Sequence, residues 1–232
     1  MIRRIISKLR HLYMLRSSNS YVTYLRSKGI AIGNGTYFQS PKTTEVDISR
    51  PSLISIGCNC FFNDYVELIS HDWVTHVFLH SGRNFINSSG RIKIGNNVAF
   101  GRHVLVLKGV TIGDNSFIGA GSIVTKDIPA NSIAAGIPCK VITTIENYYQ
   151  KRLSVSEAEA FDYARSIKER FNRRPVPADF WEEFPLFVSG NEVDNYSEIP
   201  IRRQLGPIFH KYVKVHKAKY SSFEQFLNAA GV

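Results

Sequence analysis

An apolar residue recurs at every sixth position in the middle of this chain. The series runs without a slip through Ile94, Phe100, Val106, Ile112, Ile118 and Val124. An amphipathic helix needs apolar residues at spacings of three and four, and a half-buried strand needs them at every second position. A period of six instead predicts a β-solenoid, in which each hexapeptide contributes a short strand and a tight turn and three hexapeptides complete one triangular coil. The repeated apolar residue then points inward and stacks on its counterpart eighteen residues later.

The repeat divides the chain into three parts. Residues 1–30 have helical spacing with a glycine stop at Gly29, and residues 31–146 form the solenoid. Imperfect hexapeptides begin at Ile32, residues 40–53 are irregular, and the pattern is interrupted again by a long loop at residues 72–91. A long loop on a rigid scaffold is a frequent place for functional residues. Residues 147–232 are expected to form a helical C-terminal extension, with helices at 154–171 and 223–230 and many packing aromatics.

Composition limits the functional classes. The net charge of +10 favours an anionic partner, but no nucleic-acid-binding motif is present. No apolar run is long enough to span a membrane, and the N-terminus lacks the features of a secretory signal. Three cysteines do not make a disulfide framework, so a reducing cytoplasm is the expected setting. The basic amphipathic N-terminal segment could lie on the inner membrane face or cap the open end of the solenoid.

One stretch of the chain carries a family resemblance. Residues 90–142 contain GAGSIVTKDIP followed by AAGIPCKV, and they resemble the hexapeptide-repeat O-acetyltransferases, most closely the branch that acts on sugars and on capsular or O-antigen polysaccharides. The resemblance implies a mainly β fold, the left-handed parallel β-helix. It also implies a homotrimer that uses acetyl-CoA, with an active site in each cleft between subunits and a histidine as general base.

His71 is the residue that matches the catalytic histidine of this family, because it stands where the coil gives way to the long loop. An imidazole titrates near neutral pH and can take the proton from a sugar hydroxyl. Either Glu67 or Asp72 could orient the ring, and a backbone carbonyl is a third choice. Trp73 and His103 are candidates for contact with the acceptor sugar.

The cofactor residues follow from the resemblance by position. In the family the pantetheine arm of acetyl-CoA runs along the groove between adjacent β-helices, and the 3′-phosphate meets basic side chains. The matching positions in this chain are Gly101, Ala120, Thr125, Lys126 and Lys140.

Three alternatives remain open. A γ-carbonic-anhydrase-like zinc enzyme needs three histidine ligands, whereas only His71 and His76 have suggestive spacing, so we expect no metal. A non-catalytic solenoid would lack a use for His71 and the long loop. Within the acetyltransferases, the acceptor could also be a non-sugar such as an antibiotic.

Overall fold

The computed structural model describes residues 14–232, which form two compact units. One unit extends to Tyr149 and the other comprises Gln150–Val232, and each has a hydrophobic core of its own. Most of the basic amphipathic segment at the N-terminus lies outside the described residues.

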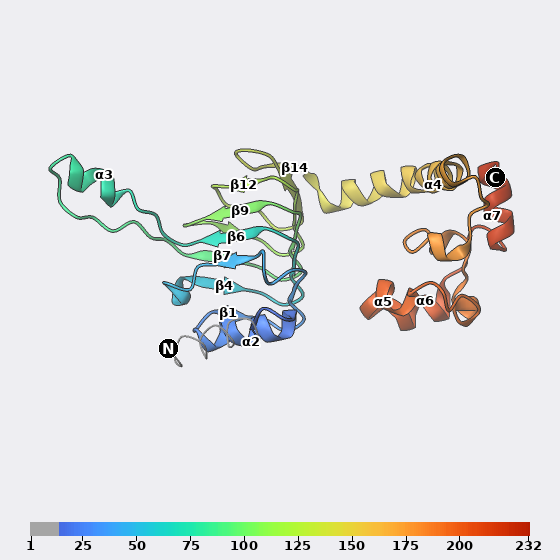
Figure 1. Ribbon diagram of the computed structural model, residues 1–232, viewed down its shortest axis with the longest axis horizontal. Helices are drawn as coiled ribbons and strands as arrows, with labels where there is room; N and C mark the ends of the chain where they lie inside the picture. Colours follow the sequence, from blue (N-terminus) through green and yellow to red (C-terminus); the bar gives the residue numbers. More distant parts are fainter. Residues whose placement is uncertain (1–13) are drawn as a thin grey trace. The chain divides into compact units, whose positions relative to one another are not determined.

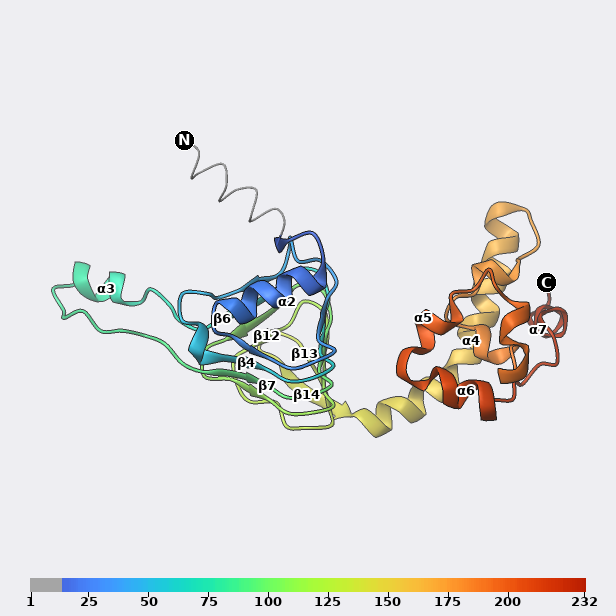
Figure 2. The same cartoon turned by 90° about the horizontal axis from the view of Figure 1, so that it is seen from below.

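The first unit is a parallel β-helix with three sheets as its sides (Figures 1 and 2). Sheet A contains β1 (Ala31–Ile32), β4 (Ile54–Ile56), β7 (Ile92–Ile94) and β10 (Thr111–Ile112). Sheet B contains β2 (Tyr37–Phe38), β5 (Phe61–Phe62), β8 (Ala99–Phe100), β11 (Phe117–Ile118), β13 (Ser132–Ala135) and β14 (Lys140–Thr144). Sheet C contains β3 (Glu45–Val46), β6 (Val66–Ile69), β9 (Val104–Leu107) and β12 (Ile123–Val124). Among the strand pairs of residues 14–232, only the terminal pair, β13 with β14, is antiparallel.

The strand register confirms the six-residue prediction. Ile94 lies opposite Ile112 in sheet A, and Phe100 lies opposite Ile118 in sheet B. The same registration in sheet C places Val106 against Val124, and all six repeat residues are buried. Removing these apolar side chains from water is the main stabilising contribution to such a coil.

A glycine is required where consecutive coils approach most closely. A Cβ atom built at Gly57 would lie 2.4 Å from the carbonyl oxygen of Gly95 in the next coil, which is far inside van der Waals contact. The glycines of the repeat therefore serve the tight stacking of backbones as much as the turns.

Residues 40–53 look irregular in sequence, but in the structure they form a regular part of the first coil. They contain β3, which pairs with β6, and a short 3₁₀ helix, η1 (Pro51–Leu53). Below this coil lies helix α2 (Ser18–Ser27), which begins after the N-cap Ser17. Its buried residues Tyr21, Val22 and Leu25 belong to the core of the β-helix, so α2 covers the open end of the coil (Figure 1).

The long loop leaves the β-helix between β6 and β7 and projects well beyond it (Figure 1). At its base, His71 and Ser89 form an antiparallel bridge, and the Gly90 N–H donates to the Ser70 carbonyl. Its outer part is not entirely loop, as predicted from the sequence, but contains helix α3 (Thr75–His80). The loop exposes several large apolar side chains, including Trp73, Val77, Phe85 and Ile86.

The second unit is helical, as predicted. Helix α4 spans Ile145–Phe171, so it starts nine residues before the predicted start at residue 154. The remaining elements are η2 (Pro177–Asp179), η3 (Phe184–Leu186), η4 (Gly190–Asn195), α5 (Ile201–Leu205), η5 (Gly206–Ile208), α6 (Phe209–Val215) and α7 (Phe223–Ala230). Phe180, Phe187 and Phe226 are fully buried in the core of this unit. These aromatics therefore pack within the extension itself.

Candidate active site

His71 and Asp47 form a close pair at the corner of the β-helix where strands of sheet C end. His71 follows β6, and Asp47 follows β3 in the preceding coil. The His71 Nδ1 atom lies 2.6 Å from the Asp47 Oδ2 atom. Because β3 and β6 are registered with Val46 opposite Leu68, the two polar side chains meet just beyond the sheet edge.

Four further hydrogen bonds hold the Asp47 carboxylate. Its Oδ1 atom accepts from the Ser49 N–H at 2.9 Å and from the Ser49 hydroxyl at 2.6 Å. Its Oδ2 atom accepts from the Ser70 N–H at 3.2 Å and from the Ser70 hydroxyl at 2.5 Å. Burial alone would raise the pKa of Asp47, but hydrogen bonds from Ser49, Ser70 and His71 outweigh it and hold that pKa well below its usual range. Asp47 is therefore ionised at neutral pH.

The charge on Asp47 decides which nitrogen of His71 is basic. A carboxylate only accepts hydrogen bonds, so Nδ1 must carry the proton that it shares with Asp47. The Nε2 lone pair then remains available, and Nε2 has no hydrogen-bond partner among residues 14–232. The side chain is 24% exposed, so a substrate can reach it. This arrangement suits a general base whose conjugate acid is stabilised by a neighbouring anion.

Neither acidic residue proposed from the sequence contacts the ring. Glu67 points outward from β6 and is exposed, facing Glu45 of β3. Asp72 instead binds Lys108 and Ser88, and the Lys108 hydrogen bond lowers the pKa of Asp72 to about 2. Asp72 thus ties the base of the long loop to the adjacent coil.

The role of Asp47 is hidden in the sequence for a geometric reason. Val46 pairs with Leu68, twenty-two residues further on, so this coil is longer than the eighteen-residue coils from Ile94 onward. A search for the clean repeat therefore treats residues 40–53 as irregular. The feature that could have pointed to Asp47 is its place directly after Val46, an inward-facing residue that is buried in the coil. Asp47 and the nearby Ser49 then form a polar cluster at the corner.

The two candidates for acceptor contact lie apart. Trp73 is 72% exposed at the start of the loop, next to the His71 corner. His103 lies at the opposite edge of sheet C, where its ring stacks on Tyr65 with centroids 4.5 Å apart. Both Tyr65 and His103 have positive φ angles, 58° and 57°, a conformation that is unusual for bulky residues and often found at functional sites.

The cofactor candidates border sheet C on two sides. Thr125 and Lys126 follow β12, at the same corner as His71 and two coils along, and both are exposed. Gly101 and Ala120 precede the strands of sheet C at the other edge. A Cβ atom at Gly101 would lie 2.5 Å from the Ala120 nitrogen, so the next coil already requires this glycine. These positions bring the basic and the small residues to one face of the β-helix.

Lys140 opens β14, and the preceding residue, Cys139, donates its N–H to the Ile123 carbonyl of β12. Lys140 therefore lies near the last strand of sheet C and is exposed.

Two further histidines, His76 and His80, lie on helix α3 of the long loop. His76 packs against His80 on α3, with ring centroids 4.5 Å apart, rather than beside His71. Within residues 14–232, no group of three or more histidine, cysteine, aspartate or glutamate side chains is arranged to hold a metal ion. Within the same range, no helix combines the length and apolar character needed to cross a bilayer.

Comparisons with known proteins place the repeat in a defined group. The sequence model of the family described as bacterial transferase hexapeptide (six repeats) matches residues 91–126. Galactoside O-acetyltransferase from Escherichia coli (strain K12) is 46% identical over 110 residues, which cover 45% of this chain and 53% of that protein. The chain thus spans about half the length of the curated relatives it matches.

Two solved structures are also similar. A galactoside acetyltransferase in complex with coenzyme A is 32% identical, with a TM-score of 0.42, over 63% of this chain and 82% of that one. The polySia-specific acetyltransferase NeuO is 34% identical, with a TM-score of 0.41, over 50% of this chain and 51% of that one. The hexapeptide match and the parallel sheets confirm the predicted left-handed β-helix.

Proposed function

Because this chain belongs to the hexapeptide-repeat acetyltransferases, on the sugar O-acetyltransferase branch, we propose that it moves an acetyl group from acetyl-CoA to a hydroxyl of a sugar. The acceptor is a precursor of a surface polysaccharide such as a capsule or an O-antigen. The single observation that carries this proposal is the Asp47–His71 pair, which leaves a basic Nε2 atom accessible at the edge of the β-helix.

The reaction needs one proton carrier and no covalent enzyme intermediate. His71 Nε2 takes the proton from the sugar hydroxyl as its oxygen attacks the thioester carbonyl. The C–S bond then breaks, and the imidazolium returns its proton to the departing CoA thiolate. Asp47 fixes the ring through Nδ1 and offsets the positive charge that His71 carries between these two transfers.

Acetyl-CoA would lie along the outer face of sheet C. Lys126 and Lys140 are exposed cations near its last strand and suit the 3′-phosphate. Gly101, Ala120 and Thr125 border the same face with small or polar side chains that let a thin pantetheine arm approach the backbone. These contacts extend from the far coils toward His71.

The cleft would be completed by neighbouring copies in a homotrimer. The long loop supports this, because Trp73, Val77 and Phe85 are each more than half exposed in the single chain. Such a set of apolar side chains is typical of a surface that another protein covers. Trp73 lies beside His71 and can stack on the acceptor ring. We place the enzyme in the cytoplasm, where its basic N-terminal segment allows peripheral contact with the inner membrane face.

A direct screen tests the proposal. Purified protein is incubated with labelled acetyl-CoA and a set of nucleotide sugars and capsular or O-antigen oligosaccharides. We expect label to enter at least one sugar as a base-labile ester. Tight binding of acetyl-CoA with no label in any acceptor would favour a non-catalytic solenoid, and label in an aminoglycoside or other antibiotic alone would shift the acceptor class.

A further inference from the structure

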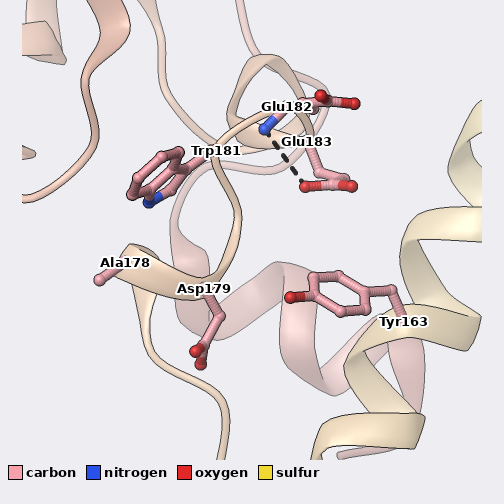
Figure 3. A pocket seen from close by; sticks show the side chains of 6 residues that line it. All are labelled: Tyr163, Ala178, Asp179, Trp181, Glu182 and Glu183. Carbon is pink, nitrogen blue, oxygen red and sulfur yellow. Dashed lines mark hydrogen bonds between the residues drawn. The ribbon is translucent and has the colours of Figure 1, made fainter. Parts of the chain in front are cut away.

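The C-terminal unit contains an open pocket of about 430 Å³. It lies between helix α4 and the segment that joins η2 to η3, and its volume is within the range of small-molecule sites. Figure 3 shows its lining residues, Tyr163, Ala178, Asp179, Trp181, Glu182 and Glu183. None of these residues has a part in the reaction proposed above.

Two aromatic side chains, Trp181 and Tyr163, line the pocket and are not buried in the core of the unit. Trp181 is 50% exposed, although its neighbours Phe180 and Phe184 are buried in the aromatic core. The ring of Tyr163 packs edge-on against that of Phe180, with centroids 5.3 Å apart, while its hydroxyl points into the pocket (Figure 3). An indole left half exposed beside a well-packed core offers a flat apolar surface to a ligand.

The carboxylates of the pocket have different roles. Asp179 is already neutralised by Arg173 through two hydrogen bonds of 2.7 and 2.8 Å, and it also accepts from the Val176 N–H. Glu183 has no ion-pair partner among the described residues, and its carboxylate accepts hydrogen bonds only from backbone N–H groups, that of Glu182 at 3.3 Å and its own. Burial raises the pKa of Glu183, so its charged form is under-solvated. A ligand that donates hydrogen bonds would relieve this cost.

We propose that this pocket is a second saccharide-binding site, which holds a neutral sugar unit of the polymer that the β-helix acetylates. A pyranose ring has an apolar face for Trp181 and hydroxyl donors for Glu183, and the Tyr163 hydroxyl can both donate and accept. An acidic sugar would be repelled by Glu182 and Glu183. The assignment of a polymeric acceptor depends on the proposed function, whereas sugar binding itself can be measured without it.

Intrinsic fluorescence gives a direct binding test, because the chain has two tryptophans. In a Trp73→Phe variant, Trp181 is the sole indole. It is titrated, without acetyl-CoA, with neutral oligosaccharides of glucose, galactose, mannose, rhamnose and N-acetylglucosamine. We expect a saturable change in emission with at least one of them. Glu183→Gln should weaken binding about tenfold or more, since a hydrogen bond to a charged group is lost. Glu198→Gln, an exposed carboxylate outside the pocket, is the matched control.

Calorimetry on Trp181→Ala provides a second measure, with near-UV circular dichroism to show that the unit remains folded. The proposal is overturned if no oligosaccharide of the panel binds, or if Glu183→Gln and Trp181→Ala bind as the parent does. A response to spermidine alone would make this a cation site and would equally overturn it. A His71→Ala variant should lose acetyl transfer but keep oligosaccharide binding, so failure of the enzymatic proposal and failure of this one are read separately.

Discussion

Replacing Asp47 by asparagine tests the proposed role of the Asp47–His71 pair. The carboxylate accepts five hydrogen bonds, from two backbone N–H groups, two serine hydroxyls and the His71 ring. An amide of the same shape has one oxygen and one NH₂ group, so it cannot accept on both sides. If the NH₂ group faces His71, Nδ1 must accept and the proton moves to Nε2. The Nε2 atom that faces the sugar hydroxyl then already carries a proton and cannot accept another as a general base.

The size of the effect follows from the bonds lost. A hydrogen bond to a charged group contributes about 1.5–3 kcal/mol, and about 1.4 kcal/mol corresponds to a factor of ten in rate. We therefore expect Asp47→Asn to lower kcat/KM by about 10- to 150-fold. The fold should survive with a loss of about 1–3 kcal/mol, because one buried donor is left without its acceptor.

Acetyl transfer is measured with labelled acetyl-CoA over a range of acceptor concentrations, which gives kcat and kcat/KM, together with urea unfolding. Glu67→Gln is the matched control, since it removes an exposed carboxylate from the adjacent strand and should change neither quantity. Equal turnover of Asp47→Asn and the parent, in folded protein, would refute the reasoning that Asp47 sets the state of His71.

Three other expectations concern stability and binding. The depressed pKa of Asp47 means that its contribution to folding is present above about pH 4, the ordinary aspartate range, and is lost as the pH falls through the folded-state value. The unfolding free energies of the parent and Asp47→Asn should thus converge below about pH 4, and a constant difference from pH 7 to pH 2 would contradict this. Gly57→Ala should destabilise the β-helix by about 1–3 kcal/mol, since its methyl group would press on the Gly95 carbonyl; an unchanged denaturation midpoint would argue against such close coils. Lys126→Ala should weaken CoA binding more than acceptor binding in calorimetry, while Lys93→Ala, an exposed lysine on sheet A, should leave CoA affinity as it was.

The sequence predicts the structure most accurately where a single physical constraint determines which residue type a position can hold. The inward positions from Ile94 to Val124 could be identified because each coil has eighteen residues and the stacking demands one apolar residue per side. His71 is proposed as the base from the sequence because the repeat stops there. Asp47 could not be identified, because its coil is longer and tolerates polar residues at the corner.

The C-terminal unit illustrates a second limit. Its final helix, Phe223–Ala230, has strong helical spacing and an N-cap at Ser222, and it was predicted with the correct ends. The Ser154–Glu157 pair resembles a capping box but lies inside α4, where Glu157 binds Lys219 and Tyr220. Local motifs cannot reveal such distant partners, which is also why the sequence does not indicate that Trp181 and Glu183 line a pocket with Tyr163.

The most direct measurement of the central claim compares acetyl transfer by the parent and by His71→Ala under identical conditions, with CoA affinity measured in parallel. The account predicts that the variant binds CoA normally and transfers acetyl groups at least about a hundredfold more slowly. If the folded variant acetylated the sugar at the parent's rate, the imidazole at the sheet C corner would not be the base.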